Sequence, residues 1–176
     1  NNLGSQIKID TIYNINKDIK KANLRFSTSI TSNEKINKIG STKIIQIPNI
    51  SSAYSTHIIN EEERKYPIVY NSYENVDHYI TEYDIYIGKS EKFTEIPKNQ
   101  FLKFKKHQYK IDYKLVNNNH LKVVIDAVTD KENILPTEYP EFKSYVSAVL
   151  EAKEAFIGFG ISSFKTSPWD IFFEGF

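Results

Sequence analysis

The segment from Leu121 to Phe159 constrains the fold of this chain more than any other. It begins with an apolar run rich in β-branched residues, passes through a polar hinge that ends at Thr137, and then changes period. From Pro140 onward, apolar residues recur at three- and four-residue spacing, which is typical of a helix with one buried face. The sequence therefore predicts a strand over 121–129 and an amphipathic helix over 140–155. The apolar positions of that segment are Phe142, Tyr145, Val146, Val149, Leu150 and Phe156.

The rest of the chain alternates apolar and polar residues, which predicts strands. The longest alternating run is 77–87, where Tyr79, Thr81, Tyr83, Ile85 and Ile87 share one face, and His78, Ile80, Glu82, Asp84 and Tyr86 share the other. Residues 109–116 and 121–129 are expected to form a hairpin. Its turn, Asn117–Asn119, suits left-handed backbone angles. Further strands are predicted at 6–15, 24–31, 42–47, 66–70, 92–96 and 157–164.

These elements favour a mainly β fold, an antiparallel β-sandwich with one C-terminal amphipathic α-helix around 140–155. The chain has 176 residues, which is long enough for a substantial core. It shows no fixed-period repeat and no low-complexity linker, so we expect a single β-rich domain over 1–176. Lysine and arginine number 23 against 22 acidic residues, and this near balance argues against nucleic acid as a partner. No apolar run approaches the length of a transmembrane segment.

Cysteine and methionine are both absent from the sequence. Without cysteine there are no disulfides, no thiolate nucleophile and no thiolate metal ligands. A cysteine-free chain fits an exported protein, so we expect a periplasmic, cell-surface or secreted location. Because there is no methionine, we expect Asn1 to begin a processed or trimmed piece.

Two polar groupings could carry chemistry. His78, Glu82 and Asp84 share strand parity and could converge on a cation or a sugar hydroxyl, but the polar outer face of an antiparallel sheet is the favoured interpretation. No HExxH, EF-hand or GxSxG pattern occurs. We therefore expect no catalytic residue, no metal site and no cofactor.

A basic stretch with interleaved aromatic residues covers 98–110. Lysine with aromatic side chains can hold single-stranded nucleic acid, but the patch is local and lacks arginine. A solvated loop leading into a strand is the favoured interpretation. The residues concerned are Lys98, Phe101, Lys103, Phe104, Lys105, Lys106, His107 and Lys110.

The last twenty residues, 157–176, form an aromatic tail. Gly158 is expected near the C-terminal cap of the helix. Burial of each large aromatic side chain contributes about 1.5–3 kcal/mol, so we expect the tail to dock on its own domain or on a neighbouring domain or subunit. The predicted partner-binding residues are Phe164, Trp169, Ile171, Phe172, Phe173 and Phe176.

A resemblance adds to these expectations. The order of Arg64–Ile68, the strand 79–87, Phe93–Pro97, the hairpin 109–129 and Tyr139–Tyr145 resembles the β-rich domains that flank the papain-like core of bacterial transglutaminase-like proteins. The resemblance covers about 44–159 and implies a β-sandwich accessory domain of an exported protein. The catalytic cysteine of that family has no counterpart here, so the resemblance implies no acyl transfer.

The sequence thus predicts a non-catalytic binding or structural module of a bacterial envelope or secreted protein. It would act through β-sheet and aromatic-tail contacts with a neighbouring domain or subunit, including a further copy of itself. Two alternatives remain open. One is a carbohydrate-binding or glycan-processing domain that uses exposed aromatic residues with Glu82 and Asp84. The other is a virus or phage structural protein.

Overall fold

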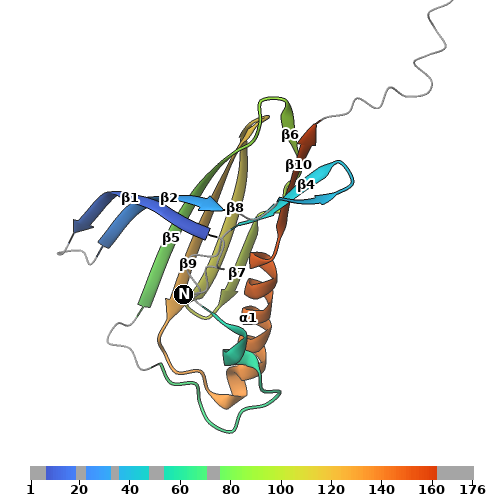
Figure 1. The fold of residues 1–176 in the computed structure, drawn as a ribbon. Helices are drawn as coiled ribbons and strands as arrows, with labels where there is room; N and C mark the ends of the chain where they lie inside the picture. The colour runs from blue at the N-terminus through green and yellow to red at the C-terminus, as the bar shows by residue number, and fades with distance from the viewer. Residues whose placement is uncertain (1–6, 19–22, 33–35, 48–53, 71–75, 162–176) are drawn as a thin grey trace, which may run out of the picture. The chain divides into compact units, whose positions relative to one another are not determined.

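The computed structural model describes residues 7–18, 23–32, 36–47, 54–70 and 76–161 (Figure 1). Clustering of contacts divides the chain into two compact units, 1–37 and 38–176. Each unit is described by itself, and the expectation of a single domain stays a prediction. The partner-binding residues predicted in the aromatic tail lie outside the described residues.

The first unit contains a two-stranded antiparallel ribbon. Strand β1 (Ile7–Asp18) pairs with β2 (Asn23–Ser32), which confirms the strands predicted at 6–15 and 24–31. The register shifts twice along the ribbon, and Asn14 takes a positive φ of 53° beside the second shift. Such irregularities bend and twist a strand pair. The exposed large apolar side chains of the ribbon are Ile12, Tyr13, Ile15 and Phe26.

The larger sheet of the second unit has the strand order β5-β9-β8-β7. The strands are β5 (Val76–Tyr86), β7 (Gln100–Phe104), β8 (His107–Asn117) and β9 (His120–Asp130), and neighbouring strands are antiparallel. This arrangement confirms the predicted strand at 77–87 and the hairpin 109–129.

The sequence predicts left-handed backbone angles in the β8–β9 turn, and the structure shows none there. Among the described non-glycine residues, positive φ angles occur at Asn14 and Lys105. The turn is instead closed by the side chain of Asn117, whose Oδ1 accepts a hydrogen bond from the backbone N–H of Asn119 at 3.0 Å. An asparagine side chain that bonds the backbone two residues later mimics a backbone turn, so it needs no left-handed residue.

Strand β7 corrects the expectation of a solvated loop at 98–110. It pairs with β8 from Gln100↔Ile111 to Phe104↔His107. Within β7, Phe104 is buried and Leu102 is half-buried, whereas Phe101 and Lys103 are exposed. Lys103 therefore lies on the solvent-exposed face of β7, where apolar and polar residues alternate.

The smaller sheet has the order β3-β4-β10-β6. Its strands are β3 (Asn37–Ile39), β4 (Thr42–Gln46), β6 (Glu91–Glu95) and β10 (Phe156–Ile161), and β10 pairs antiparallel with both β4 and β6. Gly158 lies inside β10, so its expected role as a helix cap is wrong. The strand predicted at 66–70 is reduced to a single bridge between Ile68 and Ile134.

Helix α1 (Tyr139–Lys153) confirms the predicted helix to within two residues at its C-terminus. A short 3-10 turn, η3 (Pro136–Glu138), leads into it, and Pro140 lies in its first turn, where a missing N–H costs nothing. Leu150 is half-buried. Phe156 is 51% exposed in β10 and does not belong to the helix stripe. The buried residues of α1 are Tyr139, Phe142, Tyr145, Val146, Val149 and Ala152.

One hydrophobic core joins the helix and both sheets, which gives the second unit its sandwich-like build (Figure 1). Ile111, Leu121 and Val123 project into it from the larger sheet, Val146 from α1 and Ile157 from the smaller sheet. The predicted mainly antiparallel β fold with one C-terminal helix is therefore confirmed. Within the described residues, no helix is both long enough and apolar enough to cross a bilayer.

Candidate functional site

The face of β5 and β9 that points away from the core is rich in polar side chains, and we call it the outer face. Strand pairing sets its composition, because residues at every second position share a face. Tyr86 pairs with His120, and Asp84 pairs with Lys122. The outer face consists of His78, Ile80, Glu82, Asp84 and Tyr86 from β5, and His120, Lys122, Val124, Asp126 and Val128 from β9.

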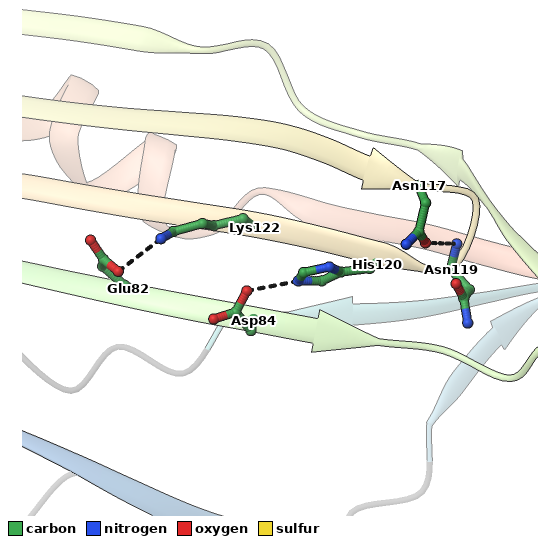
Figure 2. A network of polar contacts seen from close by, with 6 residues as sticks. All are labelled: Glu82, Asp84, Asn117, Asn119, His120 and Lys122. Carbon is green, nitrogen blue, oxygen red and sulfur yellow. Dashed lines mark hydrogen bonds and ion pairs between the residues drawn. The ribbon is translucent and has the colours of Figure 1, made fainter. Parts of the chain in front are cut away.

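Ion pairs cross diagonally between the two strands of this face (Figure 2). Nε2 of His120 lies 2.7 Å from Oδ1 of Asp84, and Nζ of Lys122 donates to Oε2 of Glu82 at 2.9 Å. A third pair, outside the figure, joins Nε2 of His78 to Oδ1 of Asp126 at 2.7 Å. Each of these acidic and basic groups thus has a partner of the opposite kind on the neighbouring strand.

The carboxylates predicted to share a face do so, but they do not converge. Glu82 and Asp84 each turn toward a different basic side chain on β9, and His78 turns toward Asp126. In the parts of the chain that the structure describes, no group of three or more potential ligands could hold a metal ion. Exposed ion pairs of this kind contribute about 0–1 kcal/mol each, so they add little to the stability of the fold.

An aromatic side chain lies at the end of the outer face. The ring of Tyr86 stacks on the imidazole of His120, with centroids 4.2 Å apart and an interplanar angle of 16°. Tyr86 is nevertheless 68% exposed. Asp84 contacts Nε2 of the same imidazole, so His120 touches both the aromatic ring and the carboxylate.

Strand β5 also forms one edge of the larger sheet. Its partner on one side is β9, and among the described residues no strand pairs with its other side. Strand β5 is eleven residues long, and it carries exposed Tyr79 and Ile80 beside His78, Glu82 and Asp84. A strand at the edge of a sheet can take up a further strand through backbone hydrogen bonds.

A second polar grouping is buried in the core around His107. This side chain has no exposed surface, and its Nδ1 lies 2.7 Å from the hydroxyl of Tyr54. Its Nε2 has no hydrogen-bond partner among the described residues. Rings surround the imidazole with centroids 5.7–6.4 Å away; they belong to Tyr54, Tyr70, Phe104, Phe142 and Tyr145.

Burial controls the charge of this cluster. It lowers the pKa of His107, and the nearby Asp130 carboxylate opposes part of that effect. Burial also raises the pKa values of Tyr54 and Tyr70, and it raises the pKa of Tyr145 to about 12. Near neutral pH, the imidazole and the surrounding hydroxyls are therefore all uncharged, as suits a core with few compensating charges.

The basic stretch 98–110 offers less free charge than its sequence suggests. Lys105 pairs with Glu138, Lys106 pairs with Glu132, and Nζ of Lys110 lies 2.6 Å from Asp112. Phe104 and His107 are buried, so they cannot stack on bases. Much of this stretch therefore belongs to a sheet, with β7 and the start of β8 inside it.

Sequence reasoning missed two features of these sites. His107 was assigned to a solvated basic stretch, although it shares strand parity with Tyr109 and Ile111, which indicates the core face. Tyr54 had no local signal, because its partner lies far away in the sequence. Comparison of the chain with family models, with curated proteins and with solved structures finds no match in any of the three.

Proposed function

We propose that this chain is a non-catalytic binding or structural module that acts through β-sheet contacts with a neighbouring domain or subunit. The observation that carries the proposal is the open edge of β5, with its exposed side chains and its basic and acidic groups. Backbone hydrogen bonds to an added strand would supply affinity, at about 0.5–1.5 kcal/mol each. The side chains of the outer face would then select the partner.

The ribbon β1–β2 supports the same proposal. A two-stranded ribbon is marginally stable by itself in water. Its exposed apolar residues Ile12, Tyr13, Ile15 and Phe26 would gain stability from any surface that covered them. A chain with such a ribbon and an open sheet edge is suited to an assembly. The aromatic tail, with Trp169 and Phe172, is proposed as a further contact.

We further propose that the module belongs to a periplasmic, cell-surface or secreted protein, on the ground of its resemblance to accessory domains of bacterial transglutaminase-like proteins. The cysteine-free composition agrees with that location. In such a protein the module would hold a neighbouring domain rather than transform a substrate.

The test is a selection of phage-displayed linear peptides on the purified chain, followed by hydrogen exchange of the complexes. The proposal expects enriched extended peptides that slow amide exchange along Val76–Tyr86. If no peptide is enriched, or if enriched peptides leave those amides unprotected, the sheet-edge role fails. Selection on a variant with Trp169, Phe172 and Phe173 changed to Ser measures the part played by the tail.

A carbohydrate-binding role is the second candidate, and one observation favours it. The exposed ring of Tyr86 is held against His120 beside the Asp84 carboxylate, which is an arrangement that could stack on a sugar and bond its hydroxyls. A glycan array compares the unchanged chain with Tyr86→Ala. Signals that disappear in the variant would support this role, and an array without signals would remove it.

A further inference from the structure

We infer that the open edge of β5 pairs with β5 of a second copy of this chain, in antiparallel orientation and with Thr81 at the two-fold axis. This inference rests on the proposed sheet-edge function, and it identifies the binding partner as a second copy of the chain. Such a contact would join two four-stranded sheets into one continuous sheet across the dimer. Each copy would use the same surface, as closed two-fold symmetry requires.

Strand geometry limits the allowed registers. The core face of both copies must point the same way across the joined sheet, and a slip of one residue turns every side chain to the other face. Two residues that face each other across the joint must therefore both have even numbers or both have odd numbers. Each allowed register is named by the residue that lies on the two-fold axis. The register centred on Thr81 pairs all eleven residues from Val76 to Tyr86 without overhang. Centring on Ile80 would leave Ile85 and Tyr86 without partners.

The charges of β5 are compatible with the same register. With Thr81 on the axis, His78 of one copy faces Asp84 of the other, and this happens twice by symmetry. Opposite charges directly across a strand pair are stabilising, whereas like charges are destabilising. Centring on Glu82 would set that carboxylate against itself. His78 and Asp84 of β5 are thus complementary to each other across an antiparallel joint.

The ion pairs within one copy extend this pattern. His78 already bonds Asp126, and Asp84 already bonds His120. In the dimer, these groups would form one row across the joint. The row would begin with Asp126 and His78 of one copy and continue with Asp84 and His120 of the other copy. Acidic and basic groups would alternate without interruption across the joint.

Apolar contact adds to the charges. Ile80 is 58% exposed on the outer face and would lie opposite Glu82 of the second copy, against the methylene groups of that side chain. On the core side, Thr81 would face its own counterpart, and threonine pairs are favourable across strands. No residue of β5 would meet a like charge directly opposite.

The chain has no cysteine, so a single introduced cysteine reports its own neighbours. Thr81→Cys is expected to give a disulfide-linked dimer under mild oxidation, because residues on the axis face each other. Ile80→Cys should cross-link far less, because residue 80 then faces residue 82. Ser147→Cys, exposed on α1, is the matched control for random collision.

Light scattering on charge variants provides the second measurement. Thr81→Lys and Thr81→Asp should each be monomeric, because like charges meet on the axis, and an equimolar mixture should recover the dimer. Circular dichroism checks that both variants fold; if either does not, the cysteine result decides. Preferential cross-linking at Ile80→Cys overturns the Thr81-centred register.

The outcomes separate this inference from the function it rests on. If the unchanged chain is monomeric at the highest attainable concentration and Thr81→Cys does not cross-link, pairing with a second copy is overturned. The sheet-edge function then stands if selected peptides still protect β5 from hydrogen exchange. If neither a second copy nor any peptide protects β5, both proposals fail.

Discussion

The hydroxyl of Tyr54 lies 2.7 Å from Nδ1 of His107, a side chain with no exposed surface. The contact ties the segment that contains Tyr54 to the start of β8, 53 residues later in the chain. It is a neutral hydrogen bond in an aromatic surrounding, where a polar group without a partner is costly.

Removing that hydroxyl should destabilise the fold. Tyr54→Phe keeps the ring and leaves Nδ1 of His107 without its partner, so we expect a loss of about 1–3 kcal/mol in the free energy of unfolding. Urea denaturation measures it. Tyr66→Phe, at an exposed position, is the matched control and should change stability by less than about 0.5 kcal/mol. Equal effects of the two variants would contradict a special role for the buried contact.

Acid should weaken the fold through His107. Its pKa in the folded chain lies below the ordinary value of 6.5, because burial disfavours the charged form. Below pH 6.5 the unfolded chain therefore binds more protons than the folded one. This contribution to stability is complete above that pH and is lost as the pH falls toward the folded pKa.

Urea midpoints at pH 7 and at pH 5 test this dependence on the unchanged chain and on His107→Gln. The variant should lose less stability between the two values, since it lacks the buried titrating group. The other three histidines are present in both proteins, so their contributions cancel. Parallel pH profiles would show that His107 does not set the acid sensitivity.

The helix packs through Phe142, which is fully buried and contacts the rings of Tyr54 and Phe104. Phe142→Ala should cost about 3–5 kcal/mol because it opens a cavity in the core. Phe156→Ala, at a half-exposed site in β10, should cost much less. Thermal unfolding of both variants distinguishes them, and similar losses would mean that Phe156 packs in the core after all.

Gly160 permits close approach of two strands. A Cβ atom there would lie 2.9 Å from the backbone oxygen of Ser41, which cannot move easily. Gly160→Ala should therefore cost about 1–3 kcal/mol. Gly88→Ala is the control, because its Cβ would meet only the flexible end of the Glu91 side chain, at 3.0 Å. Denaturant midpoints give both values, and a neutral Gly160→Ala would contradict the geometry.

Much of the fold followed from periodicity, and its failures have physical reasons. The hairpin 109–129 and the helix were predicted because each has a long, regular pattern. Strand β7 was missed because its alternation of Leu102 and Phe104 with lysine spans only five residues. A short run of lysines by itself indicates a loop. Its strand character becomes visible only when the alternation of buried and exposed positions is compared with that of β8.

The candidate sites were less accessible from sequence. The parity of His78, Glu82 and Asp84 was visible, but their partners on β9 depend on a register that spans more than thirty residues. The cluster around His107 gathers side chains from β7, β8, α1 and the loops before them. A local sequence pattern cannot predict this cluster, because its side chains come together only when the separate elements pack against one another.

Strand β10 has a consequence for the order of folding. It is the last described strand in the sequence, yet it lies between β4 and β6. Ile45 meets its partner Ile157 only across more than a hundred intervening residues. A nascent chain that has emerged as far as α1 can form the larger sheet and the β3–β4 pair, but β4 and β6 cannot be joined until Phe156–Ile161 leaves the ribosome. The smaller sheet therefore closes late, and contacts this distant in sequence slow its closure.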